Sequence, residues 1–379
     1  MCNDKFKLWK DEVMMKDRIT VHYEDKPIYD IVFEHSFDNL AEELKKLNSN
    51  ERKICIVTET KVESLYLSQV MDVLKPVCKE LISFVFPEGE ASKNLDTVKD
   101  LYECLIQHKF DRKDLLIALG GGVTGDLTGF AAATYLRGIE FVQMPTTLLS
   151  QVDSSIGGKT GVDFHAYKNM VGAFHMPKLV YIHIGTLNTL PEREFNCGLG
   201  EIIKHGLIKD NEYLLFIKEH KEDIKNRVPD VLKKMIYGSC MIKKGVVERD
   251  PKEQGERAML NFGHTLGHAI EKKMDFSMLH GECVALGSIL ALYISYQMGK
   301  ITKEEYVENR KFIEWFGYPT LPLNINPEEL IEITKVDKKM EMGSVKFIIL
   351  KKIGEAEIVK TVTDDMMKDA VTCLYSSGV

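Results

Sequence analysis

The sequence predicts an α/β nucleotide-binding domain with a largely parallel sheet, followed by a mainly helical domain. The chain has 379 residues, which exceeds the roughly 100 to 200 residues of an ordinary domain. Its first half alternates short β-branched runs with helical stretches, which is typical of βαβ units. From about Leu190 the pattern changes to helical periodicity. We therefore expect two domains, 1–189 and 190–379, with a boundary near Pro191.

The first domain is expected to contain at least five strands and two intervening helices. Strands are predicted at residues 54–58, 82–86, 114–119, 140–144 and 179–184, and helices at 64–74 and 94–108. The run 115–119 is continuously apolar, as a central parallel strand buried on both faces should be.

The second domain is expected to be mainly α-helical. Helical periodicity covers residues 198–208, 213–224, 228–248, 261–273, 282–298 and 303–315. No strand is predicted before 345–350, which with 356–360 suggests a small hairpin.

Composition excludes several classes of protein. With 44% hydrophobic and 28% charged residues the chain is typical of a soluble globular protein. A net charge of -7 disfavours nucleic acid and anionic membranes as partners, so an anionic substrate would need locally clustered cations. The eight cysteines form no C-x-x-C pair, and the start does not resemble a signal peptide. We therefore expect a cytoplasmic protein with reduced thiols.

Glycines follow the predicted central strand. The run Gly120-Gly121-Gly122-Val123-Thr124-Gly125-Asp126 precedes a stretch compatible with a helix. Glycines at such a junction let the backbone approach a pyrophosphate while helix N-terminal amides point at it. The run lacks the G-x-G-x-x-G pattern, so a tight structural turn remains the alternative. After the next strand, Thr146 and Thr147 offer hydroxyls to a cofactor or a helix cap.

A second glycine run, residues 153–161, ends in Gly-Lys-Thr. Asp153 stands where a P-loop requires its first glycine. An ATPase is therefore disfavoured.

Three segments carry candidate metal ligands. They contain Glu201, the pair His264 and His268, and His280. The paired histidines share a helix face, and two histidines with one carboxylate are typical of catalytic zinc. Thr265 replaces the glutamate of H-E-x-x-H, which disfavours a metalloprotease. The alternative is that these histidines are ordinary core or surface residues.

Lys204 follows Glu201 by three residues, which puts both charges on one helix face. Ile202, Ile203 and Leu207 surround them. These apolar neighbours favour a buried helix with its charged face toward a cavity, over a surface ion pair.

Seven motifs in order together resemble the 3-dehydroquinate synthase family. They are residues 120–126, 133–138, 145–161, 168–169, 200–204, 260–268 and 280–282, within a likeness that covers about 50–355. The resemblance implies a nucleotide-binding domain, a helical metal-binding domain and a homodimer.

The resemblance also implies a set of site residues. Zinc, with cobalt as a possible substitute, would be held by Glu201, His264 and His280. A sugar-phosphate substrate would contact Asp153, Lys159, Asn169, Lys204, Lys243, Arg257, Asn261 and His268, with Lys338 or the adjacent Lys339 at its phosphate and Arg137 reaching it from the neighbouring subunit. NAD would contact Glu59, Glu90, Lys93, Gly121, Gly122, Val123, Asp126, Thr146, Thr147, Leu149, Asp153, Lys168, Thr186, Thr189, Leu190 and Glu194. Near Thr186 the chain departs from the family, because His183-Ile184-Gly185 stands where an Asp-containing turn is usual.

The implied reaction converts 3-deoxy-D-arabino-heptulosonate 7-phosphate to 3-dehydroquinate and phosphate in the shikimate pathway. It proceeds through transient oxidation by NAD, phosphate elimination, re-reduction and an intramolecular aldol step. Rival interpretations are another sugar-phosphate cyclase, of the 2-deoxy-scyllo-inosose or epi-valiolone synthase type, a metal-dependent alcohol dehydrogenase of the glycerol dehydrogenase type, and an inactive binding protein. Lys168, Asn169, Arg257 and the other basic residues favour a substrate that carries a carboxylate.

Overall fold

The computed structural model describes residues 17–165, 167–275, 277–318, 325–338 and 346–375, with side chains for all of these except 336–338. These residues divide into two compact units. One unit consists of the chain up to Leu190 together with Leu232–Lys252. The other consists of Pro191–Val231 and the chain from Glu253 onward.

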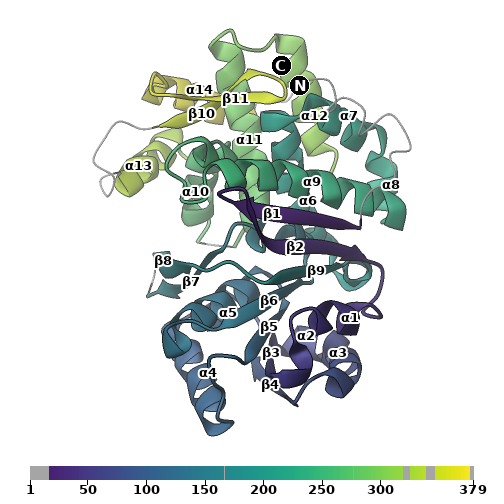
Figure 1. Ribbon diagram of the computed structural model, residues 1–379. Helices are drawn as coiled ribbons and strands as arrows, with labels where there is room; N and C mark the ends of the chain where they lie inside the picture. The colour runs from purple at the N-terminus through teal and green to yellow at the C-terminus, as the bar shows by residue number, and fades with distance from the viewer. Residues whose placement is uncertain (1–16, 166, 276, 319–324, 339–345, 376–379) are drawn as a thin grey trace. The chain divides into compact units, whose positions relative to one another are not determined.

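The first unit contains a seven-stranded sheet in the order β1-β2-β9-β6-β5-β3-β4 (Figure 1). Its strands are β1 (Arg18–Tyr23), β2 (Lys26–Glu34), β3 (Lys53–Glu59), β4 (Glu80–Phe86), β5 (Leu115–Gly120), β6 (Glu140–Pro145) and β9 (Leu179–His183). All neighbours are parallel except β1 and β2. The prediction of a largely parallel sheet and of its five strands is confirmed.

Helices cover both faces of this sheet (Figure 1). They are α1 (Leu40–Lys45), α2 (Thr60–Val62), α3 (Ser68–Leu74), α4 (Leu95–Gln107) and α5 (Gly122–Thr134). Along β3, Ile54 and Ile56 join the core beneath α1 and α3, whereas Cys55 and Val57 join the core beneath α4 and α5. This alternation follows from the two-residue period of a strand.

The hairpin of β1 and β2 was not predicted. Its turn residues Glu24 and Asp25 have φ of 49° and 60°. Such turns usually carry asparagine or glycine, and neither signal is present.

A second unpredicted hairpin consists of β7 (Lys159–Phe164) and β8 (Tyr167–Phe174). We expected residues 153–161 to form a single glycine loop, and this is wrong for its last part. A turn at Gly157 and Gly158, both with positive φ, precedes the hairpin, and β7 begins at Lys159. A Cβ at Gly161 would lie 2.8 Å from the Val171 carbonyl oxygen, so this glycine is needed for strand pairing.

Most of α9 (Pro229–Arg249) is grouped with the sheet. The centroids of the Tyr237 ring on α9 and the Phe33 ring on β2 lie 5.4 Å apart. The His22 backbone N–H donates to the Glu248 carboxylate at 2.7 Å.

The second unit is mainly helical, as predicted. It contains α6 (Glu192–Lys209), α7 (Asn211–Glu219), α8 (Lys221–Lys225), α10 (His264–Lys273), α11 (His280–Gln297), α12 (Lys303–Glu314), α13 (Pro327–Lys338), α14 (Asp364–Tyr375) and a hairpin of β10 (Phe347–Lys352) and β11 (Glu355–Val359). The hairpin was predicted, whereas α13 and α14 were not.

Two predicted helices have different bounds. The helix expected at 213–224 is interrupted at His220, which caps α7 by donating its N–H to the Phe216 carbonyl. The helix expected from residue 261 begins only at His264, because Gly263 has a φ of 77°.

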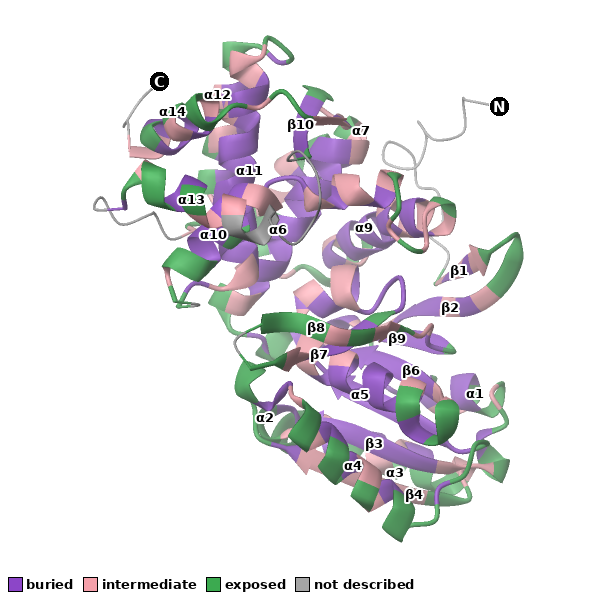
Figure 2. Ribbon diagram, turned by 90° about the vertical axis from the view of Figure 1, so that its left-hand side faces the viewer, coloured by how far each residue is buried: buried purple, intermediate pink, exposed green. Residues whose placement is uncertain are grey.

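Helix α11 is buried along most of its length (Figure 2). Its backbone touches the backbones of two neighbouring helices through glycines. A Cβ at Gly281 would overlap the carbonyl oxygen of Cys197 on α6, and a Cβ at Gly287 would overlap that of Gly263 before α10. The Gly281 N–H donates to the Cys197 sulfur at 3.1 Å. These contacts fix α6, α10 and α11 at the closest possible spacing. None of the described helices is both long and apolar enough to cross a membrane.

Candidate active site

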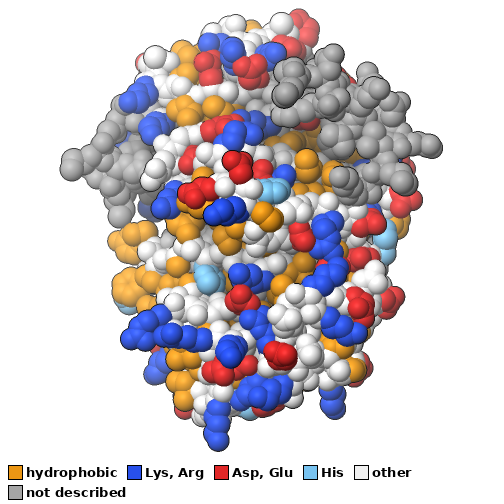
Figure 3. All heavy atoms as spheres, viewed as in Figure 1, with side chains coloured by type: hydrophobic (Ala, Val, Ile, Leu, Met, Phe, Trp, Pro, Cys, Tyr) orange, Lys and Arg blue, Asp and Glu red, His pale blue; other side chains and the backbone are white. Residues whose placement is uncertain are grey.

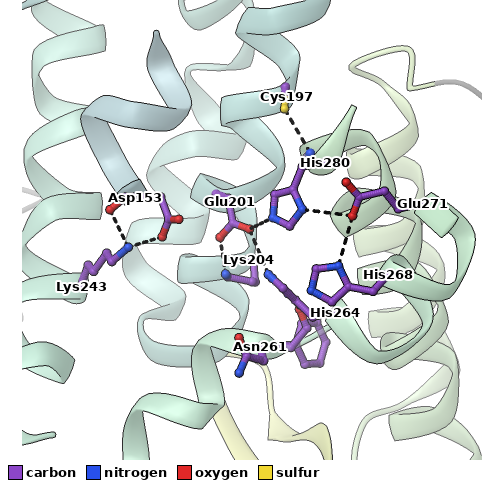
Figure 4. Close-up of polar contacts among 12 residues, drawn as sticks. Asp153, Cys197, Glu201, Lys204, Lys243, Asn261, His264, His268, Glu271 and His280 are labelled. Atoms are coloured by element: carbon purple, nitrogen blue, oxygen red, sulfur yellow. Dashed lines mark hydrogen bonds and ion pairs between the residues drawn. The ribbon is translucent and has the colours of Figure 1, made fainter. Parts of the chain in front are cut away.

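Three predicted metal ligands converge in the helical unit (Figure 4). Glu201 lies in the middle of α6, while His264 and His280 are the first residues of α10 and α11. The Glu201 Oε1 atom lies 3.6 Å from His264 Nε2 and 3.7 Å from His280 Nε2. One nitrogen or oxygen from each residue lies within 4.8 Å of the other two. The three donor atoms are therefore close enough together to bind one metal ion.

The donor set fits a divalent ion. Glu201 is 1% exposed, and its Oε1 atom has no hydrogen-bond partner, which is uncommon for a buried carboxylate oxygen. His264 Nδ1 lies 3.1 Å from the Phe262 carbonyl oxygen, and His280 Nδ1 faces the Glu271 carboxylate at 3.7 Å. Both imidazoles thus turn Nε2 toward Glu201. Two histidines and a carboxylate with further positions open are typical of catalytic zinc.

Lys204 governs the electrostatics of this cluster. Its ammonium contacts the Glu201 carboxylate one turn away on α6, and both side chains are buried. Burial alone would raise the pKa of Glu201, but Lys204 and the two imidazoles hold that pKa well below its usual range. Burial and Lys204 also keep the pKa of His264 well below normal. The predicted buried helix face with paired charges is confirmed.

His280 differs from His264 because carboxylates lie on both sides of its ring. Burial would lower the pKa of His280, but Glu201 and Glu271 raise it to about 9. In the absence of an ion His280 is therefore protonated at neutral pH.

His268, the alternative ligand by helical spacing, lies outside this three-residue group. It is half exposed, and its Nδ1 lies 3.2 Å from Glu271. Glu271 itself was not singled out from the sequence. The only available signal was its position three residues after His268 on the same helix face.

Two further predicted substrate residues lie before α10. Arg257 is 3% exposed in a 3₁₀ helix at Glu256–Asn261. Asn261 ends that helix and donates to the Glu253 carboxylate at 3.1 Å. Lys338 is the last residue of α13, and its side chain and all of Lys339 lie outside the described residues.

In the sheet-containing unit, Lys243 and Asp153 form a pair. The Lys243 ammonium donates to the Asp153 carbonyl oxygen at 2.6 Å and contacts its carboxylate. Lys243 is 5% exposed on α9, whereas Lys159 and Lys168 are exposed on the β7–β8 hairpin. The predicted substrate residues of this unit thus include an ion pair between the buried Lys243 and the partly exposed Asp153.

The turn between β5 and α5 is very short. Gly121 alone separates the strand from the helix, which begins at Gly122. The Thr146 N–H donates to the Gly120 carbonyl at 3.0 Å, and the Thr147 and Ser150 hydroxyls lie 2.9 Å apart. The junction therefore has the strand, turn and helix order of a nucleotide-binding loop, and Thr147 also acts as a local cap. Val123 lies in the first turn of α5, directly after the glycines. Leu149 lies in the helical turn that follows Thr147.

Lys93 connects residues assigned to different ligands. This buried ammonium donates to the Asp126 carboxylate at 2.7 Å and to Asn169 Oδ1 at 2.6 Å. Lys93 thus links another predicted NAD residue, Asp126, to a predicted substrate residue, Asn169.

Other predicted NAD residues have local structural partners. The Glu59 carboxylate caps α2 by accepting the N–H groups of Lys61 and Val62. Thr186 is buried, and its hydroxyl lies 2.8 Å from the His183 carbonyl and 3.2 Å from that of Thr146. The remaining members are Glu90 in an exposed 3₁₀ turn, Thr189 and Leu190 before the unit boundary, and Glu194 in the first turn of α6.

Comparison with known proteins identifies the family. The model of the 3-dehydroquinate synthase N-terminal region matches residues 83–197, and that of the C-terminal region matches residues 198–340. The chain belongs to the 3-dehydroquinate synthase family. A 3-dehydroquinate synthase from Acetivibrio thermocellus is 44% identical over 323 residues, which cover 85% of this chain and 90% of that protein.

Solved structures share the family's fold. ValA (2-epi-5-epi-valiolone synthase) from Streptomyces hygroscopicus subsp. jinggangensis 5008, with NAD⁺ and Zn²⁺ bound, has a TM-score of 0.84 at 26% identity, over 94% of this chain and 99% of that one. A 2-deoxy-scyllo-inosose synthase complexed with carbaglucose-6-phosphate, NAD⁺ and Co²⁺ has a TM-score of 0.82 at 24% identity, over 93% and 99%. The second likeness establishes the fold alone.

Proposed function

We propose that this chain is a 3-dehydroquinate synthase that converts 3-deoxy-D-arabino-heptulosonate 7-phosphate to 3-dehydroquinate and phosphate. The observation that carries the proposal is 44% identity with a 3-dehydroquinate synthase over 90% of its length. Identity with a related cyclase, 2-epi-5-epi-valiolone synthase, is only 26%. The substrate class therefore follows the first protein.

We further propose that the enzyme uses NAD and a divalent ion, zinc or its substitute cobalt, held by Glu201, His264 and His280. Support comes from the unpartnered buried oxygen of Glu201 and from the Zn²⁺ and NAD⁺ of the valiolone synthase structure. When bound, NAD would accept and return a hydride, and the ion would acidify substrate hydroxyls. The glycine junction from Gly120 to Gly122 would meet the pyrophosphate of NAD.

The chain's own side chains would bind and orient the substrate. Lys204 keeps Glu201 ionised, and its charge also suits an anionic substrate. Lys243 and Arg257, both nearly inaccessible to water, would pair with the substrate carboxylate and phosphate, since guanidinium and ammonium groups form charge-assisted hydrogen bonds with such anions. Half-exposed His268 would contact the substrate.

We also propose a homodimer in which Arg137 reaches the neighbouring subunit. Arg137 is exposed after the exposed Leu136. Hydrophobic side chains gather over β7 and β8 (Figure 3), where Phe164, Tyr167, Met170 and Phe174 are 44 to 60% exposed. The Nε2 atom of His175, next to Phe174, lies 2.8 Å from the Ile139 carbonyl oxygen, so the segment that follows Arg137 contacts the end of this hairpin. A cytoplasmic location is proposed from the free state of all seven cysteines in the described part of the chain.

The direct test is to incubate the zinc-loaded protein with NAD and the heptulosonate 7-phosphate. We expect equal amounts of phosphate and 3-dehydroquinate, with no net NADH. Accumulation of NADH would indicate an alcohol dehydrogenase instead. Activity only on a sugar phosphate without a carboxylate would indicate another cyclase.

Two variants sharpen this test. Lys159→Ala and Arg257→Ala, which replace predicted substrate contacts, should each abolish turnover while leaving NAD affinity largely intact. Lys45→Ala, which removes a half-exposed lysine from α1, is the control and should retain full activity.

A further inference from the structure

Glu271 is a buried carboxylate whose surroundings point to a role at the metal cluster. It lies on α10, three residues after His268 and seven after His264, so all three share one face of the helix. The residue is 5% exposed. Burial of a carboxylate is costly unless its partners compensate. The imidazoles of His268 and His280 both face it (Figure 4).

The same carboxylate oxygen of Glu271 lies near an Nδ1 atom of both rings. Its Oε2 atom lies 3.2 Å from His268 Nδ1 and 3.7 Å from His280 Nδ1. On the opposite edge of its ring, His280 presents Nε2 to Glu201 Oε1 at 3.7 Å. The His280 ring is therefore held between two buried carboxylates, one at each nitrogen.

We propose that Glu271 is a positioning residue that fixes His280 for metal binding and aligns His268 beside it; the inference rests on the proposed metal site. A carboxylate that accepts the Nδ1–H of a histidine selects the tautomer with an unprotonated Nε2 and orients the ring. Once the ring loses its second proton to bind an ion, the remaining proton stays on Nδ1 and the Nε2 atom that faces Glu201 offers the lone pair. Because the same oxygen accepts from His268, a change in the position of one ring is transmitted to the other.

The experiment measures zinc affinity of the full-length apoprotein by competition with a chromophoric chelator. Glu271→Leu removes the acceptor and should weaken zinc binding about 10- to 100-fold. Glu271→Gln retains an acceptor oxygen and should lose less. Both variants should also alter the visible absorption spectrum of the cobalt-loaded protein, whereas a purely structural role would leave that spectrum unchanged. Circular dichroism confirms that each apoprotein is folded.

The control is Glu43→Gln, which neutralises a similarly buried carboxylate paired with Arg18 in the sheet-containing unit. It should bind zinc as the wild type does. The inference is overturned if both Glu271 variants have a zinc affinity within twofold of that of the wild type and if their cobalt-loaded forms have the wild-type absorption spectrum. It is equally overturned if the wild type binds two zinc ions and the variants one, because His268, Glu271 and His280 would then hold an ion of their own. If the wild type binds no zinc, the proposed metal site itself fails.

Discussion

On α6 the ammonium of Lys204 contacts the carboxylate of Glu201, and the two side chains are only 2% and 1% exposed. Such a pair gains little net stability, because both charges lose their hydration. Its effect is to keep Glu201 ionised in a buried position where two imidazoles also converge. The pair therefore keeps the proposed metal ligand Glu201 ionised at the expense of fold stability.

Replacing Lys204 by methionine should destabilise the apoprotein by about 3 to 5 kcal/mol, because the Glu201 charge is left buried without its partner. Zinc should recover much of this loss, since the ion neutralises the same carboxylate. Urea unfolding with and without zinc measures both values. Lys209→Met, on the same helix but in a more exposed pair with Glu256, should cost at most about 1 kcal/mol. Equal losses for both variants would contradict this account.

Gly281→Ala tests the glycine contacts that set the ligand spacing. The added methyl group would overlap the Cys197 carbonyl, so α11 must move away from α6 and carry His280 from Glu201. We expect loss of zinc binding together with a large drop in unfolding temperature. Gly245→Ala on α9 is the matched control, because its methyl group would meet only the Arg249 side chain at 3.4 Å, and alanine favours helices. Retention of zinc by Gly281→Ala would show that the spacing is not critical.

Zinc binding should depend on pH through His280. Its pKa of about 9 in the free protein means that zinc must displace one proton at neutral pH, whereas His264 and Glu201, with lowered pKa values, are already deprotonated. Affinity should therefore rise about tenfold per pH unit between about pH 6.5 and about pH 8. Calorimetry in buffers of different ionisation enthalpy counts the released protons. An affinity independent of pH would refute this assignment.

The proposed dimer is tested at the β7–β8 hairpin. Phe174→Asp introduces a charge among exposed apolar side chains and should convert a dimer into monomers, as measured by light scattering after size-exclusion chromatography. Ile106→Asp, at another exposed apolar position on α4, should leave the dimer intact. A wild-type monomer, or a Phe174→Asp dimer, would place the interface elsewhere.

The parallel sheet and the helical second half could be predicted because their signals are local. The β-branched run 54–58 and the apolar run 115–119 form strands in any context that buries both faces. The β1–β2 hairpin was missed because its turn residues, Glu24 and Asp25, adopt left-handed conformations without the Asn-Gly or Asp-Gly pair that usually indicates such a turn. The β7–β8 hairpin was missed because Gly157 to Gly161 resembled one loop.

In the candidate site, too, the residues with a sequence signal could be predicted and those that depend on long-range contacts could not. Glu201, His264 and His280 could be named from residue type, spacing and family resemblance. Glu271 could not, because its importance depends on α10 and α11 touching through Gly263 and Gly287, a long-range contact that no local pattern encodes. The break at His220 depends likewise on a cap that forms only in the folded chain.

The central claim is that one divalent ion lies between Glu201, His264 and His280. Anomalous diffraction from zinc-loaded crystals, recorded on both sides of the zinc absorption edge, tests it most directly. We predict a single strong peak about 2.0 to 2.2 Å from a Glu201 oxygen and from both Nε2 atoms. A peak elsewhere, or none at this cluster in protein that is fully active, would contradict the account.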